Sequence, residues 1–119
     1  MKKKIVIVED SKLVHKMYEL MLRQYELIHT FDGHEALQKL AHHPDAALIL
    51  LDLNMPRMSG LELLGRLKQD PVFKEIPVVI VSTEGKEADT ERGLEAGAAA
   101  YITKPFQREE IVDVIAKLT

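Results

Sequence analysis

The sequence contains no cysteine among its 119 residues. Disulfide bonds, thiolate metal sites and cysteine nucleophiles are therefore excluded, and the composition fits a reducing cytosol. An excess of positive charge is also missing, because the formal net charge is −3 at pH 7. Without a basic field, attraction to nucleic acid or to an anionic membrane is not expected.

Long hydrophobic runs are missing as well. The longest purely apolar stretch covers residues 46–51, whereas roughly 20 apolar residues are needed to cross a bilayer. The apolar run that follows the lysines at positions 2–4 is broken at Glu9, which makes it too short for a secretory signal. We therefore expect a cytoplasmic protein without membrane insertion, and a single domain over residues 1–119.

Short apolar runs and helical patterns alternate five times along the chain. The predicted strands cover residues 5–8, 27–31, 46–51, 78–81 and 99–103. The predicted helices cover residues 34–41, 86–96 and 107–118, and two more contain the apolar residues between positions 13 and 21 and between positions 61 and 67. Runs without polar alternation are typical of strands that are buried on both faces. Strict alternation of strands and helices implies βαβ units and a parallel sheet between two helical layers, which is an α/β fold.

Two of the helical patterns predict which side chains face the sheet. In the first helix these are Leu13, Val14, Met17, Leu20 and Met21. The fourth helix offers only Ala88, Leu94 and Ala96, and Gly93 in its interior costs about 1 kcal/mol relative to alanine. We therefore expect the fourth helix to be held weakly. A switch element and a plain solvated helix both fit this pattern.

Polar side chains follow four of the predicted strands. Glu9 and Asp10 follow the first strand, Asp52 the third, Ser82 the fourth and Lys104 the fifth. Because parallel strands end at one edge of a sheet, these side chains should gather there. Taken singly, Asp10 could cap a helix, and Ser82 and Lys104 could be ordinary loop residues. Two like charges about 4 Å apart cost on the order of 4 kcal/mol at an effective dielectric of about 20, so clustered carboxylates indicate a bound cation.

This set of donors suits Mg²⁺, which prefers carboxylate oxygens and keeps positions for water and phosphate. A carboxylate beside that ion can attack phosphorus and form an aspartyl phosphate. Lys104 would then neutralise charge on the phosphoryl oxygens, and Ser82 would donate a hydrogen bond to one of them. The pattern therefore favours Mg²⁺-dependent phosphoryl transfer.

Four segments together resemble the receiver domain of two-component response regulators. They are residues 8–11 (VEDS), 51–56 (LDLNMP) with 59–60 (SG) following, 81–85 (VSTEG) and 101–106 (YITKPF). The resemblance covers essentially the whole chain, in the order of the family. It implies a single doubly wound, flavodoxin-like (CheY-like) sheet of five parallel strands in the order 2-1-3-4-5, with five helices.

The resemblance also implies how a phosphoryl group and a metal ion are held. Asp52 is then the phosphoacceptor, and Asp10 is a direct Mg²⁺ ligand. Glu9 supports the ion through water, and the backbone carbonyl of Asn54 completes the protein's share of the ligands. The Lys104–Pro105 bond is implied to be cis, which proline makes affordable.

Further residues are implied to respond to the phosphoryl group. Lys104 pairs with the phosphate, and Ser82 is the hydroxyl that moves towards it, at a position where the family more often has threonine. Tyr101 matches the aromatic side chain that turns inward when Ser82 moves. Asn54 and Glu84 border the route of the attacking water, and this pairing of residues is that of chemotaxis-type receivers, which implies fast self-dephosphorylation.

By the same resemblance the chain is a phosphorylation-dependent signalling switch rather than an enzyme. A sensor histidine kinase or a phosphotransfer protein would supply the phosphoryl group. The face built from the fourth helix, the fifth strand and the fifth helix would engage a downstream target protein. DNA binding is not expected, because no residues follow Thr119 to form a helix-turn-helix.

Three other interpretations stay open. A Mg²⁺-dependent phosphatase also forms an aspartyl phosphate, but such enzymes usually carry a second aspartate where this chain has Asn54, and a cap domain for which residues are lacking. A non-phosphorylated interaction module on the same fold is disfavoured by the complete acidic set. Residues 1–119 could also be a receiver excised from a larger transcription regulator or hybrid kinase.

The five histidines show no ligand spacing. His42 and His43 are adjacent, so they point in different directions and cannot chelate one ion well. His15, His29 and His34 are interpreted as solvated side chains, as imidazoles in helices and turns commonly are.

Overall fold

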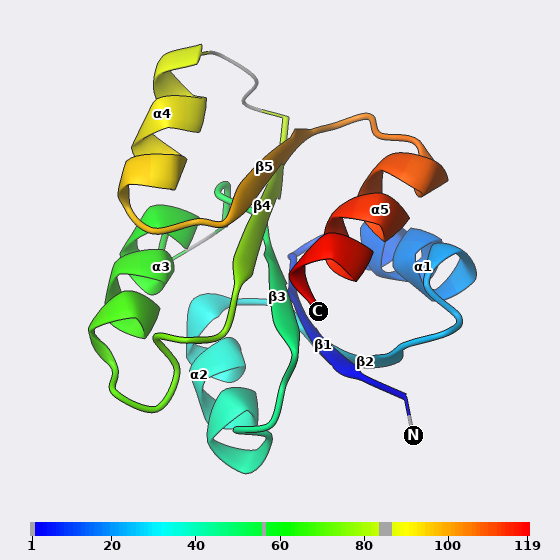
Figure 1. The fold of residues 1–119 in the computed structure, drawn as a ribbon. Helices are drawn as coiled ribbons and strands as arrows, with labels where there is room; N and C mark the ends of the chain where they lie inside the picture. The colour runs from blue at the N-terminus through cyan, green and yellow to red at the C-terminus, as the bar shows by residue number, and fades with distance from the viewer. Residues whose placement is uncertain (1, 56, 84–86) are drawn as a thin grey trace.

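A computed structural model describes residues 2–55, 57–83 and 87–119, and it shows a five-stranded parallel sheet between two layers of helices (Figure 1). The strands are β1 (Lys4–Val8), β2 (Glu26–Thr30), β3 (Leu48–Leu51), β4 (Val78–Ser82) and β5 (Ala100–Thr103). The helices are α1 (Lys12–Met21), α2 (Gly33–His42), α3 (Gly60–Gln69), α4 (Glu87–Glu95) and α5 (Arg108–Leu118). The strand order is β2-β1-β3-β4-β5, so the predicted α/β fold and its order 2-1-3-4-5 are confirmed.

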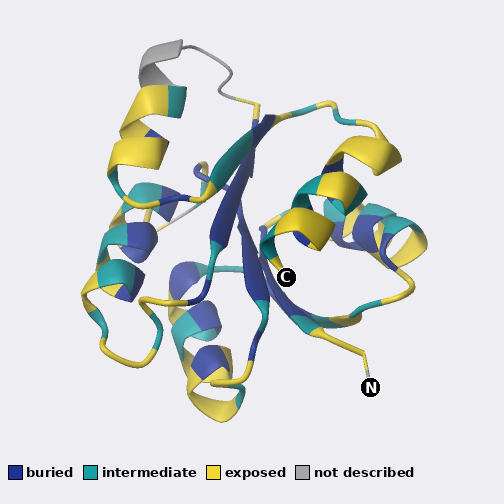
Figure 2. Cartoon of the chain, viewed as in Figure 1, coloured by how far each residue is buried: buried dark blue, intermediate teal, exposed yellow. Residues whose placement is uncertain are grey.

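The central strands are buried on both faces, as their uninterrupted apolar runs predicted. Every residue of β3 and β4 is buried, and so are residues 5–8 of β1 (Figure 2). Helices α1 and α5 cover one face of the sheet, while α2, α3 and α4 cover the other (Figure 1). Two apolar cores result, one on each face. Burial of both faces forces the polar residues of these strands to their ends.

Three helices begin at capping side chains in the segments that connect them to the preceding strands. The oxygens of Ser11, Asp32 and Ser59 accept hydrogen bonds from backbone N–H groups in the first turns of α1, α2 and α3. Each cap satisfies one of the N–H groups that a helix start leaves unpaired. The caps therefore fix where the chain turns from strand to helix, which is the edge that carries the polar residues.

The predicted inward face of α1 is partly wrong. Leu13 and Leu20 are 69% and 66% exposed, whereas His15 and Tyr18 are buried. Val14 and Met21 pack against the core as predicted, but the buried side chains are His15, Tyr18 and, just after the helix, Leu22, so the helix is rotated relative to the stripe predicted from its aliphatic residues. The rotation has two visible causes. His15 bonds the backbone at the end of β1, and the ring of Tyr18 stacks on Phe106.

The prediction for α4 is wrong for one residue and confirmed for another. Leu94 is 44% exposed, and Ala96 packs against the core. The side chain of Ala88 lies outside the part of the chain that the structure describes. Gly93 is buried, and a Cβ atom there would lie 2.5 Å from Cδ1 of Ile80. The glycine that lowers helix propensity therefore lets α4 approach the sheet closely.

The two ends of the chain lie at the edge of the sheet where the strands begin. Nζ of Lys3 donates a hydrogen bond to the backbone oxygen of Thr119 at 2.8 Å. No described helix has the length and apolar character that a membrane span requires.

Candidate functional site

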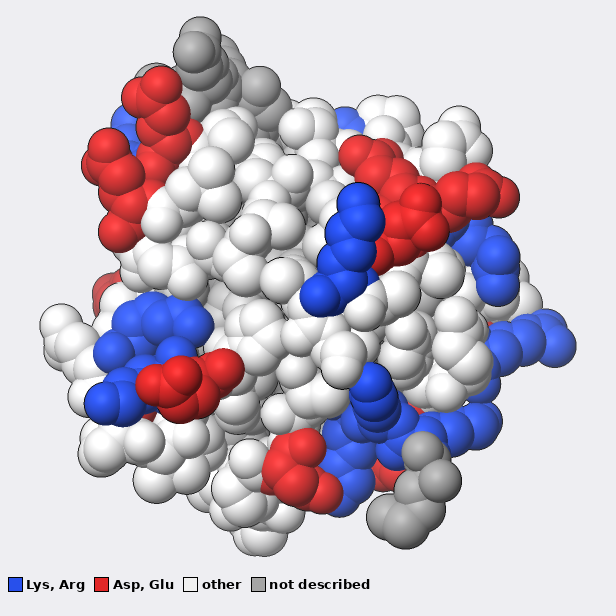
Figure 3. Space-filling model, viewed as in Figure 1, with Lys and Arg blue, Asp and Glu red and all other residues white. Residues whose placement is uncertain are grey.

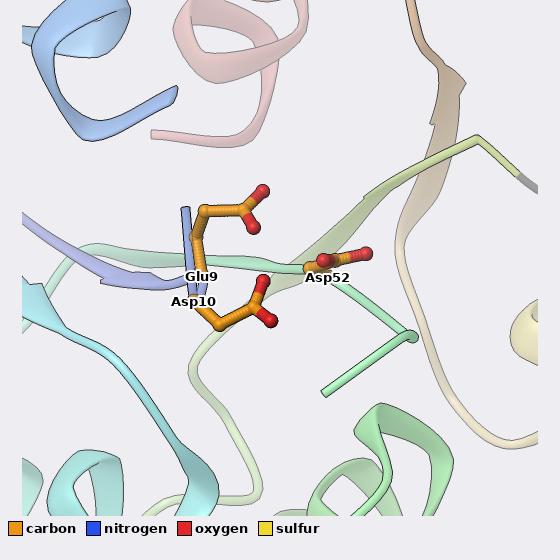
Figure 4. A group of neighbouring side chains, drawn as sticks. All are labelled: Glu9, Asp10 and Asp52. Atoms are coloured by element: carbon orange, nitrogen blue, oxygen red, sulfur yellow. The ribbon is translucent and has the colours of Figure 1, made fainter. Parts of the chain in front are cut away.

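The acidic residues of the site extend the strand ladders by one position. The N–H of Glu9 donates to the carbonyl of Thr30 at 3.1 Å, and the N–H of Asp52 donates to the carbonyl of Val8 at 3.0 Å. The sheet thus fixes the backbone at both positions. The side chains of Glu9, Asp10 and Asp52 lie together at this edge (Figure 4).

One carboxylate oxygen from each of Glu9, Asp10 and Asp52 lies within 4.8 Å of the others. Glu9 is 2% exposed and Asp52 is 6% exposed, while Asp10 is exposed. Oxygens that share an octahedral Mg²⁺ lie about 3–4 Å apart, given bonds of about 2.0–2.1 Å. The three carboxylates therefore fit a hard cation, with room for one of them to act through water.

Lys104 lies against this cluster. Its Nζ is 2.5 Å from Oε1 of Glu9 and 3.9 Å from Oδ2 of Asp52. Its N–H donates to the carbonyl of Ser82 at 2.8 Å, and the Lys104–Pro105 bond is cis, as expected. The sequence predicted that Lys104 would face the acidic residues, and the structure adds that its nearest partner is Glu9.

The electrostatics of the three carboxylates differ. Burial and the negative charge of Glu9 raise the pKa of Asp52 to about 7. Partial desolvation raises the pKa of Asp10 although its side chain is largely exposed, and the hydrogen bond and negative charge of Glu9 add to the effect. Burial opposes ionisation of Glu9, but the hydrogen bond and charge of Lys104 outweigh it, and the pKa of Glu9 lies below its usual value. Lys104 therefore favours the ionised form of Glu9 most, while the pKa values of Asp10 and Asp52 stay raised.

The backbone around Asp52 leaves almost no free space. The Asn54 N–H donates to Oδ1 of Asp52 at 3.2 Å. The Gly60 N–H donates to the carbonyl of Leu53 at 3.1 Å, and a Cβ atom on Gly60 would lie 2.4 Å from the carbonyl oxygen of Asp52. Only glycine permits this approach, which holds the start of α3 against the residue after β3.

Ser82 lies on the strand next to Asp52, and Tyr101 lies on the strand beyond it. Leu51 pairs with Ile80 across β3 and β4, so the last residue of β4, Ser82, lies on the strand beside Asp52. Ser82 is fully buried. Tyr101 pairs with Ile80, and its ring is half-buried beside Gly93 of α4. Ser82 and Tyr101 therefore lie at the end of the fourth strand and in the fifth strand, as the sequence predicted. Their roles in switching remain predictions.

Glu84 lies outside the residues that the structure describes. The interpretation of His15 as a solvated side chain is wrong, because it is 4% exposed and its Nε2 lies 2.7 Å from the carbonyl oxygen of Glu9. His15 therefore holds the backbone of the acidic site. The signal in the sequence was the spacing of His15, Tyr18 and Leu22, which offers α1 a second inward face.

Comparisons with known proteins agree on one family. The family model for the response regulator receiver domain matches residues 5–116. The polar-differentiation response regulator DivK of Brucella ovis is 39% identical over 97% of this chain and 94% of its own length. Chemotaxis protein CheY1 of Helicobacter pylori is 37% identical over 87% of this chain and 86% of its own length. The structure is similar to that of the phosphorylated cyanobacterial phytochrome response regulator RcpA, with a TM-score of 0.84, 33% identity, and coverage of 99% of this chain and 91% of that one.

Proposed function

The chain belongs to the response regulator receiver domain family, and from this premise we propose that Asp52 accepts a phosphoryl group in a Mg²⁺-dependent reaction. Receiver domains of this type are signalling proteins rather than classical enzymes, and their role depends on phosphorylation. Residues 1–119 would form one receiver domain. Its donor would be a sensor histidine kinase or a phosphotransfer protein.

The observation that carries the proposal is the position of Asp52 among the charges of the site. Glu9 is paired with Lys104 at 2.5 Å and accepts the Ser11 N–H at 3.2 Å, so both its oxygens are engaged. Asp52 lies beside the other charges, and its Oδ1 accepts a hydrogen bond from the backbone N–H of Asn54. Its Oδ2 is 3.9 Å from Lys104 and is the oxygen best placed to attack phosphorus.

The transfer follows from what these residues can do. An oxygen of Asp52 forms the new P–O bond, while the bond from phosphorus to the donor's imidazole nitrogen breaks and its electron pair leaves with that nitrogen. Mg²⁺, held by Asp10, Asp52 and the Asn54 carbonyl with Glu9 acting through water, would supply charge that offsets the phosphoryl oxygens. Lys104 would shift from Glu9 towards the phosphoryl group. Asn54, together with Glu84, would border the water that later hydrolyses it.

The readout would be a change on the face formed by α4, β5 and α5. Ser82 would move towards the phosphoryl group and Tyr101 would turn inward behind it, because Ser82 ends the strand beside Asp52 and Tyr101 lies on the next strand, β5. Acidic side chains gather over α4 and over the start of α5, with a largely uncharged surface between them (Figure 3). A target protein with an apolar contact region and basic margins would suit this face.

Phosphorylation by a small donor tests the proposal directly. Acetyl phosphate with Mg²⁺ should add one phosphoryl group, measured by intact-protein mass spectrometry, and Asp52→Asn should abolish it. Asp45→Asn is the matched control, because Asp45 is an exposed aspartate paired with Lys4 at the far edge of the sheet. Equal labelling of the Asp52→Asn protein would overturn the assignment.

A further inference from the structure

A chain of hydrogen bonds connects the acidic site to the edge strand β2 through two histidines. Nε2 of His15, on α1, lies 2.7 Å from the backbone carbonyl oxygen of Glu9. Nδ1 of the same ring lies 2.6 Å from Nδ1 of His29, on β2. The phosphorylation reaction uses neither imidazole, so the pair needs an explanation of its own.

The carbonyl oxygen of Glu9 sets the direction of both hydrogen bonds. A carbonyl oxygen can only accept, so Nε2 of His15 carries the hydrogen and donates it. In the neutral ring the other nitrogen, Nδ1, is then an acceptor. The short contact between the two rings is therefore a hydrogen bond that Nδ1 of His29 donates to Nδ1 of His15. This bond holds His15 in the tautomer that Glu9 requires.

The hydrogen bond from His15 orients the peptide group between Glu9 and Asp10. This group is trans, since the cis bond found among the described residues is the one before Pro105. A trans peptide is planar, so fixing its oxygen also fixes the Cα atom of Asp10. The N–H of Glu9 is held as well, by the carbonyl of Thr30 at 3.1 Å. The direction in which both carboxylate side chains leave the backbone is thereby set.

The ring of His15 has little freedom to turn. It is 4% exposed and packs on Phe31, with ring centroids 4.2 Å apart and ring planes tilted by 33°. Both of its nitrogens are bonded, one to the acidic site and one to His29. A buried donor with both ends engaged can hold the backbone of residues 9 and 10 in one orientation.

We propose that His15 is a positioning residue for the Mg²⁺ site and that His29 holds it in the required tautomer, an inference that rests on the proposed Mg²⁺-dependent function. Glu9 and Asp10 supply two of the three clustered carboxylates, and they flank the peptide group that His15 binds. Their charges repel, so without a fixed backbone the two side chains would tend to turn apart. A backbone that is already oriented leaves less freedom for Mg²⁺ to remove on binding.

Mg²⁺ titration by calorimetry, at one fixed pH, tests the role of His15. His15→Leu should weaken Mg²⁺ binding by about tenfold, the size of effect that partners of metal ligands have. His15→Gln should retain most of the affinity, because its amide N–H reaches the position of Nε2. His15→Asn should behave like His15→Leu, because its amide nitrogen reaches only the position of Nδ1.

Substitutions of His29 should show the opposite preference between the two amides. Its donor is Nδ1, and the amide nitrogen of asparagine reaches that position. His29→Asn should therefore keep the Mg²⁺ affinity of wild type, whereas His29→Gln should weaken it. A role in packing alone would not reverse the preference between the two positions. His29 is partly exposed, so these variants should fold, which circular dichroism checks.

Two further measurements separate positioning from a general loss of structure. Long-range ¹H–¹⁵N correlation spectra of the imidazoles should show His15 with hydrogen on Nε2 and none on Nδ1. Labelling with acetyl phosphate should need more Mg²⁺ for half-maximal rate in His15→Leu, while the rate at saturating Mg²⁺ should stay close to that of wild type. A damaged fold would lower the saturated rate as well.

His42→Gln is the matched control, because His42 is exposed and its Nδ1 contacts the carbonyl of Gln38 within α2. It should leave the Mg²⁺ affinity unchanged. Unchanged affinity in His15→Leu, or the same ranking of the two amides at positions 15 and 29, would overturn the proposal. A wild-type protein that neither binds Mg²⁺ nor takes up phosphate would instead refute the proposed function.

Discussion

Helices α3 and α4 follow neighbouring strands of the same sheet, yet they are attached to it very differently. Helix α3 begins at the Ser59 cap and buries Leu63, Leu64 and Leu67 completely. In α4 the described side chains are those of residues 90–95, and among them only Gly93 is buried. Helix α3, which is packed firmly, follows Asp52, the proposed phosphoacceptor. Helix α4, which has few buried side chains, follows Ser82, the hydroxyl proposed to move on phosphorylation.

The contrast separates two tasks of a switch. The acceptor carboxylate has to stay in place for the metal ion and the phosphoryl group, which favours an element with a large buried face. An element that changes position must do so at a small cost in free energy, which favours few buried apolar contacts. Of the two interpretations of α4, the switch element is favoured over a plain solvated helix, because α4 contacts β5 directly beside Tyr101.

The largest expected effect is on stability in α3. Leu64→Ala should lower the free energy of unfolding by about 2–5 kcal/mol, because it empties a fully buried site in the core. Leu94→Ala in α4 is the matched control, and it should change stability by about 0.5 kcal/mol or less, since Leu94 is 44% exposed. Urea unfolding of both variants measures the difference. Similar losses for the two would remove the contrast between the helices.

Gly60 in α3 and Gly93 in α4 allow a second comparison of how tightly the two helices fit against the sheet. Alanine at position 60 would place a methyl group 2.4 Å from the carbonyl oxygen of Asp52, and this backbone cannot move without disturbing the acceptor. Gly60→Ala should therefore cost about 1–3 kcal/mol and slow phosphoryl uptake. At position 93 the nearest atom is the terminal methyl of Ile80, which can rotate away.

Gly93→Ala should consequently be the milder change, because alanine's helix propensity offsets the crowding by about 1 kcal/mol. Unfolding midpoints and acetyl phosphate labelling rates compare the two variants under identical conditions. A larger loss of stability for Gly93→Ala than for Gly60→Ala would mean that α4 is the more tightly fitted helix.

The smallest expected effect is that of Mg²⁺. The ion binds the folded cluster and not the dispersed chain, so about 10 mM Mg²⁺ with an assumed dissociation constant of about 1 mM should stabilise by roughly 1.4 kcal/mol. The increment should be unchanged in Leu94→Ala and should shrink in Asp52→Asn, which removes a ligand charge. Thermal melts in EDTA and in Mg²⁺ at fixed ionic strength supply the measurement. An unmoved wild-type melt would show that the acidic cluster is not a metal site.

The stability of wild type and that of Asp52→Asn should depend differently on pH in EDTA. The pKa of Asp52 is raised to about 7 in the fold, above the usual 3.8, so the folded state holds the proton more tightly than the unfolded chain. Stability from this group is present below pH 4 and is lost as the pH rises through 7. Asp52→Asn should therefore gain stability over wild type as the pH increases from 4 to 8, as followed by urea midpoints.

The fold was predictable because its strands are buried on both faces. An uninterrupted run such as residues 48–51 has few alternatives once helical patterns flank it. The helix faces were less certain, since exposed Leu13 and Leu20 suggest one stripe in α1 while His15 and Tyr18 define the real one. Aliphatic spacing alone could not decide between these faces, because hydrogen bonding of His15 to the sheet sets the rotation.

The sequence predicted which residues gather in the candidate site, but it did not predict which of them contact each other. That Glu9, Asp10, Asp52 and Lys104 lie together follows from parallel topology, because each comes after a strand. Which carboxylate Lys104 contacts depends on side-chain geometry, and the order of residues carries no information about it. The meeting of His15 and His29 was hidden for the same reason, since they belong to different elements 14 positions apart.

The bond between Lys3 and Thr119 has a practical consequence for handling the molecule. It brings both termini to the edge where the strands begin, and the acidic cluster lies just after the strand ends, at the opposite edge. A tether at either end would leave the edge that carries Asp52 unobstructed, and a short peptide could join the two ends into a ring. Immobilised or cyclised, the chain should remain open to phosphoryl donors.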